Sequence, residues 1–157
     1  SEYRAEARVD LVDIDPDALA LARENAEYRG LASRVEILRS DLFQELGARR
    51  YDIILSNPPY VDARDLASMP AEYQHEPALA LGSGADGLAL TRRILQVAAD
   101  FLEPTGLLVV EVGNSWEQLE SAYPDVPFTW LEFEHGGHGV FALTAQELQS
   151  YRESLAG

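Results

Sequence analysis

The segment Asn57-Pro58-Pro59-Tyr60 contains the residues of this chain that best fit a chemical task. It follows an apolar run over residues 51–56, which predicts a buried parallel strand, and open α/β sheets bind ligands at the carboxyl ends of such strands. The two prolines fix the backbone and remove two N–H donors, so nearby carbonyl groups stay free to accept hydrogen bonds. Asn57 adds a side-chain amide, and Tyr60 adds a flat ring with a polar tip. This set can hold a planar NH2 group, although a tight Pro-Pro turn after a strand is also common without any function.

Held in this way, an amide nitrogen would be activated as a nucleophile. Its lone pair is normally delocalised into the carbonyl group, which makes it unreactive. If the Asn57 side-chain oxygen and the Pro58 carbonyl accept its two hydrogens, the nitrogen becomes more pyramidal and its lone pair can point at a methyl group on a sulfonium donor. Catalysis would then consist of positioning and electrostatics. The sequence has no cysteine and no Gly-x-Ser-x-Gly motif, so nothing in it indicates a catalytic triad.

Two acidic residues follow two earlier predicted strands. Asp13 ends the first strand, where a carboxylate of a doubly wound fold can accept both ribose hydroxyls of an adenosine cofactor, and Ile14 could pack on the adenine. Asp41 follows the second strand and could accept from the exocyclic amine of adenine, while the Leu42 backbone contacts the ring edge. The structural alternatives are a solvent-facing strand end at Asp13 and a helix cap at Asp41.

Two features resemble metal sites, but we interpret neither as one. Residues 13–24 carry oxygen ligands at calcium-loop spacing, yet the sixth position is Ala18 instead of glycine and the rest reads as an apolar helix face. His135 and His138 lie three residues apart in a predicted hairpin turn, with no cysteine and no further histidine nearby. His75 is interpreted as a structural or substrate-facing residue. The sequence therefore predicts no metal site.

Length and composition predict a single globular domain. The 157 residues are enough for a substantial core, and 46% of them are hydrophobic. No apolar run reaches the length of a membrane span, and no signal-peptide pattern is found. The lack of cysteine excludes disulfides and is compatible with the cytoplasm. Twelve Lys and Arg against 27 Asp and Glu give a net charge of −15, which repels a phosphate backbone and suits a basic protein partner, although plain solubility is the simpler meaning.

The hydrophobic pattern alternates strands with helices, which predicts a parallel doubly wound sheet with an antiparallel hairpin at its end. The first helix lies between Asp15, its N-cap, with Pro16 at the first position, and Gly30, which ends it. The segment 61–87 is rich in Pro, Gly, Ala and Asp, and loops of this length are usually functional or disordered. Strands are predicted at residues 9–13, 35–38, 51–56, 107–112, 128–133 and 140–143, and further helices at residues 89–102, 115–122 and 145–155.

Four segments share the motifs of a known family. They are Asn57 to Tyr60, His75-Glu76-Pro77 with Leu79 and Leu81, Gly82 to Leu88, and Glu111-Val112-Gly113. Together they resemble the protein glutamine methyltransferases, which use S-adenosylmethionine to methylate the side-chain amide of a glutamine. DNA amino methyltransferases share the Asn-Pro-Pro-Tyr box, but the Glu-Pro and Asp-Gly blocks at this spacing make the resemblance specific. It covers the chain from Val9 to Leu143.

The resemblance implies a fold, a cofactor and a set of site residues. The fold is a Rossmann-like class I methyltransferase sheet, mostly parallel with a C-terminal antiparallel hairpin, and the cofactor is S-adenosylmethionine. The implied catalytic residues are Asn57, Pro58 and Tyr60, the cofactor-binding residues Asp13, Ile14, Asp41, Leu42 and Asn57, and the substrate-binding residues Asn57, Pro58, Pro59, Tyr60, Glu76 and Pro77.

Two substrate branches of this family compete. One modifies the Gly-Gly-Gln motif of release factors, and the other modifies a glutamine of ribosomal large-subunit protein three. Residues 90–94, 123–133 and 139–141 resemble the ribosomal-protein branch, which we favour. The expected partner is therefore a ribosomal protein in the cytoplasm, with no membrane and no direct nucleic-acid contact.

The sequence departs from the family at one point. Family members carry a Gly-rich loop after their first strand and a helical domain ahead of it, and neither is found here. We therefore interpret residues 1–157 as part of a catalytic domain, without the N-terminal helical domain, first strand and Gly-rich loop. We expect this piece alone to be inactive, to bind cofactor weakly or not at all, and to associate through its open sheet.

Three other function classes are alternatives. A nucleic-acid amino methyltransferase would share the chemistry but needs a basic surface, which would have to lie outside this chain. A nicotinamide oxidoreductase would share the fold but has no role for the Asn-Pro-Pro-Tyr box. A non-catalytic scaffold derived from the fold is consistent with the missing loop, whereas the intact box argues against it.

Overall fold

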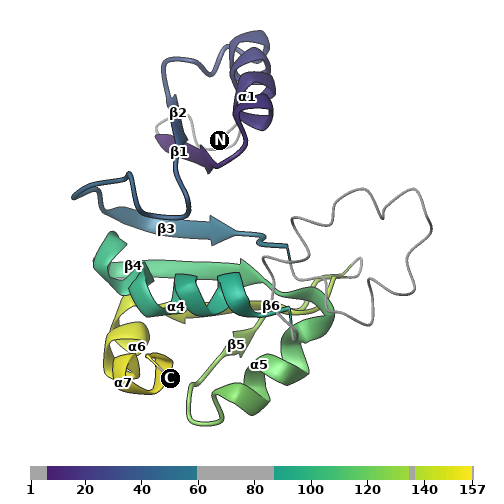
Figure 1. Cartoon of the computed structure of the whole chain (residues 1–157), viewed down its shortest axis with the longest axis vertical. Helices are drawn as coiled ribbons and strands as arrows, with labels where there is room; N and C mark the ends of the chain where they lie inside the picture. Colours follow the sequence, from purple (N-terminus) through teal and green to yellow (C-terminus); the bar gives the residue numbers. More distant parts are fainter. Residues whose placement is uncertain (1–6, 60–86, 135–136, 157) are drawn as a thin grey trace. The chain divides into compact units, whose positions relative to one another are not determined.

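The computed structural model describes residues 7–59, 87–134 and 137–156 (Figure 1). Tyr60, His75, Glu76, Pro77 and His135 therefore lie outside the described residues. The chain divides into two compact units, residues 1–49 and residues 50–157.

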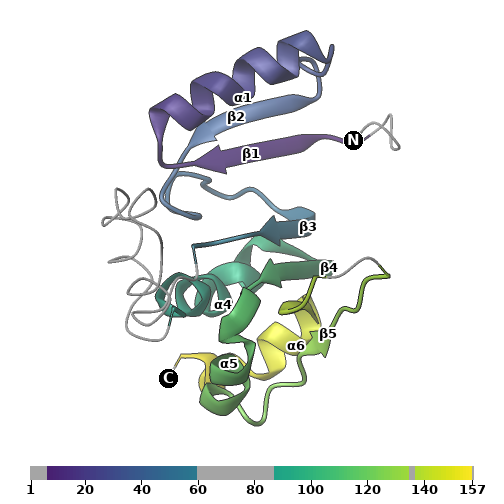
Figure 2. The ribbon, with the colours of Figure 1, turned by 90° about the vertical axis from the view of Figure 1, so that its right-hand side faces the viewer.

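The first unit is a β-α-β unit with a parallel strand pair. Strand β1 (Val9–Asp13) and strand β2 (Val35–Arg39) pair in parallel, and helix α1 (Pro16–Tyr28) packs on both strands (Figure 2). The predicted helix signals are confirmed, because the Asp15 side chain accepts a hydrogen bond from the Asp17 N–H at 2.9 Å, with Pro16 following as the first helical residue. Gly30 lies two residues after the end of α1 and has a φ of 65°, a conformation that glycine adopts without strain.

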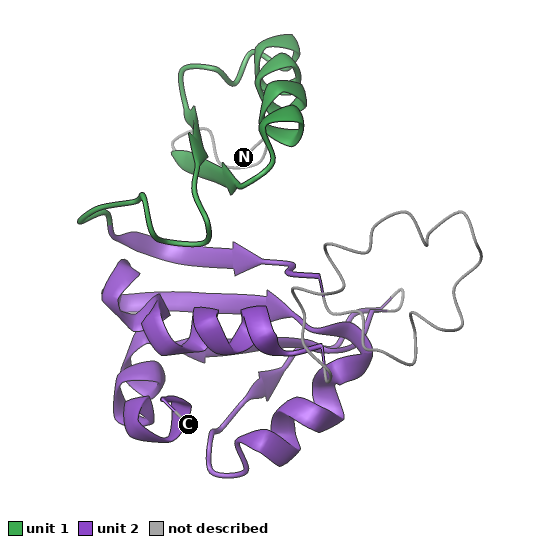
Figure 3. Cartoon of the chain, viewed as in Figure 1, with its two compact units in different colours: residues 1–49 green, residues 50–157 purple. Residues whose placement is uncertain are grey.

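The second unit, coloured purple in Figure 3, contains a four-stranded mixed sheet in the order β3-β4-β6-β5. Strands β3 and β4 run parallel, while β6 is antiparallel to both β4 and β5, which confirms the predicted C-terminal hairpin. The elements are β3 (Tyr51–Ser56), α4 (Ala89–Phe101), β4 (Leu102–Glu111), the 3-10 turn η1 (Gly113–Ser115), α5 (Trp116–Ala122), β5 (Thr129–Trp130), β6 (Val140–Thr144), α6 (Ala145–Ser150) and α7 (Arg152–Leu155).

The core of the second unit forms where helices α4 and α6 pack against β4 and against each other. Its members are apolar side chains that are almost fully excluded from solvent. They include Leu88, Ile94, Leu95, Ala98, Leu102, Leu108, Val110, Phe141, Leu143, Leu148 and Leu155. This core holds β3, β4 and β6 in a fixed register, and the positions of their ends depend on it.

Several local predictions were wrong. The hydrophobic pattern of the two longest helices predicts that Leu21 and Val97 face the core, but both side chains are exposed. Strand β3 was predicted to be buried, yet Ile53 and Leu55 on its alternate positions are 58% and 74% exposed. It is the outermost strand of its described sheet, so it has fewer neighbours to cover it. The last helix was predicted to be continuous but is interrupted at Tyr151.

None of the helices in the described residues combines the length and the apolarity that a membrane crossing requires.

Candidate functional site

The carboxyl end of β3 presents the predicted amide-binding residues. Asn57 and Pro58 follow the last strand residue, and Asn57 is exposed whereas Pro58 is buried. The buried proline ring anchors the turn, and its fixed φ limits how far the preceding amide can move. Within the described part of the chain, the Asn57 side chain has no hydrogen-bond partner, so its oxygen remains available to accept from a ligand.

The neighbouring strand ends at the same edge of the sheet. Because Ser56 of β3 pairs with Val110 of β4, Asn57 lies level with Glu111, and η1 begins two residues after Glu111. The carboxyl ends of parallel strands meet at one edge, which is where open α/β sheets bind ligands. The geometry of this unit therefore supports a site at the Asn57 end.

The edge also includes a pair of residues that the sequence analysis did not assign to the site. Asn114 in η1 and His138 before β6 are joined by a hydrogen bond of 3.0 Å between Asn114 Oδ1 and His138 Nε2. From the sequence, His138 was interpreted as part of a hairpin turn and not as a metal ligand. The available signal was the pair of glycines beside them, Gly113 and Gly139, which mark a close approach of two backbones.

In the first unit, the predicted cofactor residues also gather at the carboxyl edge of parallel strands. Asp13 ends β1 and pairs with Arg39, the last residue of β2, and Asp41 follows two residues later. Ile14 is 59% exposed directly after β1, and its carbonyl accepts a hydrogen bond from the Arg39 Nε at 3.2 Å. An exposed apolar side chain at a sheet edge that also carries two carboxylates is a suitable surface for an aromatic base with hydroxyl and amine donors.

Both carboxylates also have structural contacts. Asp13 Oδ1 accepts from the Asp15 N–H at 2.9 Å, which shapes the entry to α1 and leaves its second oxygen for a ligand. Asp41 Oδ2 accepts from the Gln44 side-chain amide at 3.3 Å, and the Asp41 N–H donates to Glu45 at 3.1 Å. The structural and the cofactor interpretations of these residues are therefore compatible.

Leu42 adopts a backbone conformation that its residue type disfavours. Its φ is 53°, in the left-handed region, and it is the one non-glycine with positive φ among the described residues. The Ser40 hydroxyl, which is almost fully buried, donates to the Leu42 carbonyl at 2.8 Å and accepts from the Glu45 N–H at 3.1 Å. Residues in this conformation concentrate at functional sites, which fits the role predicted for the Leu42 backbone. The sequence analysis did not identify Ser40 as its support.

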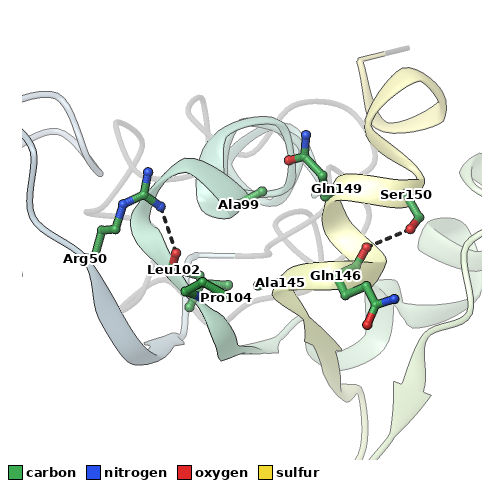
Figure 4. Close-up of a pocket in the computed structure, with 8 residues that line it drawn as sticks. All are labelled: Arg50, Ala99, Leu102, Pro104, Ala145, Gln146, Gln149 and Ser150. Carbon is green, nitrogen blue, oxygen red and sulfur yellow. Dashed lines mark hydrogen bonds between the residues drawn. The ribbon is translucent and has the colours of Figure 1, made fainter.

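A surface hollow of about 350 Å3 lies at the other end of the second unit (Figure 4). Its wall includes Arg50 just before β3, Leu102 at the start of β4 and Ala145 just after β6. Arg50 Nη1 donates to the Leu102 carbonyl at 2.9 Å. These positions are at the amino ends of β3 and β4, opposite to Asn57, so the hollow is separate from the candidate site.

Comparison with known sequences gives a consistent set of relatives. The model of the methyltransferase small domain family matches residues 1–73. A ribosomal protein uL3 glutamine methyltransferase of Neisseria gonorrhoeae is 52% identical over 148 residues, which is 94% of this chain and 49% of that protein. A protein of the same name from Francisella tularensis is 49% identical over 150 residues, covering 96% of this chain and 48% of that protein. The chain thus spans about half the length of these relatives.

Solved structures share the fold. TrmN from Thermus thermophilus superposes with a TM-score of 0.61 at 24% identity, over 91% of this chain and 38% of that chain. An RNA methyltransferase from Salinibacter ruber, solved in complex with S-adenosyl-L-homocysteine, has a TM-score of 0.52 at 19% identity, over 88% of this chain and 66% of that chain. At these identities the likeness concerns the fold alone, and it confirms the predicted mixed α/β fold of class I methyltransferases.

Proposed function

From its relationship to the uL3 glutamine methyltransferases over nearly its whole length, we propose that this chain is the catalytic part of an S-adenosylmethionine-dependent enzyme that methylates a glutamine side chain of ribosomal protein uL3. The sequence match runs across both units, which supports their assignment to one catalytic domain. Such a substrate would place the enzyme in the cytoplasm, and the net charge of −15 favours a protein over a nucleic acid as the partner.

The observation that carries the proposal is the Asn57-Pro58 turn at the carboxyl end of β3. Asn57 is exposed, has no side-chain partner among the described residues, and is anchored by the buried Pro58. The Asn57 side-chain oxygen and the Pro58 carbonyl would accept the two hydrogens of the substrate amide and turn its lone pair outward. Tyr60, Glu76 and Pro77 remain predicted substrate contacts.

The residues of the first unit fit the cofactor's adenosine part. Asp13 offers its second carboxylate oxygen for the ribose hydroxyls, Ile14 offers an apolar surface for the base, and Asp41 with the Leu42 backbone would contact the base edge. When bound, the cofactor supplies a methyl group on a sulfonium ion. The substrate nitrogen would gain that methyl group as the sulfur–methyl bond breaks to leave a neutral thioether. It would release one of its two protons to solvent water, so no side-chain nucleophile is required.

Methyl transfer by the full-length product of the gene that encodes this chain tests the proposal. Labelled S-adenosylmethionine is incubated with unmethylated uL3 in one reaction and with a release factor in another, and the label is located by peptide mass. We expect the label on one glutamine of uL3. Label only on the release factor would retain the chemistry and reject the substrate. Label on neither protein would reject the proposed function and favour the nucleic-acid or scaffold alternatives.

A further inference from the structure

We propose that the Asn114–His138 pair is a substrate contact that binds the main chain of the polypeptide segment carrying the target glutamine. This inference rests on the proposed function and extends it to a second point of contact at the same edge of the sheet. The pair belongs entirely to the second unit, as does Asn57, so their relation follows from the register of one sheet.

The position of the pair is fixed by a close approach of two backbones. The Val112 N–H donates to the Gly139 carbonyl at 2.7 Å, which extends the β4–β6 ladder beyond Glu111. A Cβ atom at Gly139 would lie 2.8 Å from the backbone nitrogen of Gly113 and would overlap its carbonyl oxygen. Both glycines have positive φ, 51° and 71°, so only glycine fits here without strain. His138 is thereby held beside Asn114.

The hydrogen bond leaves one imidazole nitrogen available. With the Asn114 oxygen as acceptor, Nε2 of His138 carries the proton, and Nδ1 of the neutral ring is an acceptor. In the part of the chain that the structure describes, Nδ1 has no partner, and both side chains are exposed. An exposed acceptor with a fixed orientation can bind a backbone N–H without the entropy cost of ordering the ring.

The distance from the Asn57 position fits a peptide. Asn57 follows β3 level with Glu111 of β4, which pairs with Val140 of β6, so Asn57 and Val140 are separated by two strand spacings, or about 10 Å. His138 lies two residues before Val140, so its backbone is a few ångströms farther from Asn57, at about 12 Å. An extended peptide covers this distance in about three residues. His138 would therefore contact the main chain near the glutamine and not the reacting amide. The acidic net charge of the chain argues against a nucleic acid at the same place.

The experiment uses the full-length enzyme with unmethylated uL3. We expect His138→Ala to raise KM for uL3 about 5- to 10-fold, with kcat within about twofold of wild type, because one hydrogen bond to the substrate is lost. Asn114→Ala should raise KM by about two- to threefold, because the ring remains but is no longer oriented. Gln149→Ala removes a side-chain hydrogen bond to Arg152 at the other end of this unit and serves as the matched control.

Each result either supports or overturns the inference. An unchanged KM of His138→Ala in an active enzyme overturns it and leaves the proposed function intact. Equal KM increases in His138→Ala and Asn114→Ala, together with a lower unfolding temperature, mean that the pair only holds the chain in place, and this also overturns it. If the wild-type enzyme methylates no glutamine, the proposed function fails. The inference is then tested by calorimetry, which compares the binding of uL3 by wild type and by His138→Ala. Weaker binding by His138→Ala than by wild type supports it, whereas equal or undetectable binding of both overturns it.

Discussion

Asn57 combines an exposed amide with a backbone that Pro58 holds in place, and this combination favours the proposed role in catalysis over a role in folding. We expect Asn57→Ala in the full-length enzyme to lower kcat by about 100- to 1000-fold, because one preorganised acceptor of the substrate amide is lost. Cofactor affinity and thermal stability should stay close to wild type. Asn25→Ala removes an exposed amide from α1 and is the control. A near-normal kcat of Asn57→Ala would reject the assigned mechanism.

Asp13 is expected to act on the cofactor and not on the rate of methyl transfer. Asp13→Ala should weaken binding of S-adenosylhomocysteine to the full-length enzyme by about 10-fold or more, because a charged acceptor of two hydroxyls is removed. Calorimetry gives the dissociation constant directly. Asp13→Asn retains an oxygen for the Asp15 N–H and separates the loss of charge from a disturbed α1 entry. An unchanged dissociation constant in both variants would remove Asp13 from the site.

Among the elements, α6 has the best-defined start. The Thr144 hydroxyl accepts from the Glu147 N–H at 3.2 Å, and a Glu147 carboxylate oxygen accepts from the Thr144 N–H at 2.8 Å, which forms a capping box. Thr144→Ala should lower the free energy of unfolding of the second unit by about 1 kcal/mol. Urea unfolding followed by the combined fluorescence of Trp116 and Trp130, which contact each other in the second unit, measures this change. Ser121→Ala, in the last turns of α5, should be nearly neutral, and a loss as large as that of Thr144→Ala would contradict the capping argument.

The parallel pair β1–β2 is joined by an ion-pair cluster. Arg49 donates to both carboxylate oxygens of Glu36 at 2.8 and 2.9 Å and to Asp10 at 2.8 Å. The hydrogen bonds that Glu36 accepts from Arg49, together with the positive charge of Arg49, lower the pKa of Glu36 below its ordinary value of 4.5. A carboxyl group whose pKa is lower in the folded state stabilises it above the ordinary value, and this contribution is lost as the pH falls through the folded value.

The acid side of the stability profile tests this cluster. Amide hydrogen exchange in β2, corrected for intrinsic rates, should show less protection below pH 4.5 than at pH 6. Glu36→Gln should reduce this pH dependence by lowering protection at pH 6. Glu27→Gln, on the exposed side of α1, should leave the pH dependence of protection in β2 unchanged. A wild-type profile in Glu36→Gln would show that the cluster does not contribute measurably to the stability of this unit.

The sequence predicted the type and order of the described elements because their signals are local. The Asp15-Pro16 start of α1 and the apolar run of β3 need no information from distant residues. Two hydrogen bonds were not predicted: the one from the Ser40 hydroxyl to the Leu42 carbonyl, and the one between His138 and Asn114 at the same sheet edge as Asn57. Each depends on residues brought together by strand register or by an unusual φ angle, which periodicity does not encode. The break at Tyr151 was also missed, since the pattern of 145–155 continues through it.

For the whole molecule, strong negative charge and exposed apolar surface have opposite effects on self-association. A net charge of −15 keeps copies apart at low ionic strength, and salt screens this repulsion. Ile53 and Leu55 lie on one face of β3, the outermost strand of its described sheet, and both are more than half exposed. Apolar side chains on an outermost strand are a common site of association between copies. Salt should therefore promote association of this chain.

We expect residues 1–157, expressed alone, to associate reversibly in sedimentation velocity at about 100 µM, and more strongly in about 0.5 M NaCl than in about 0.05 M NaCl, since the Debye length falls several-fold over this range. Replacing Ile53 and Leu55 by threonine retains β propensity and removes apolar surface, so the association constant should fall by at least about tenfold. Replacing Leu21 and Val97, which are also exposed but lie on helices, should have a smaller effect. A chain that stays monomeric at high salt, or variants in β3 that associate as strongly as wild type, would show that the surface of β3 does not drive association.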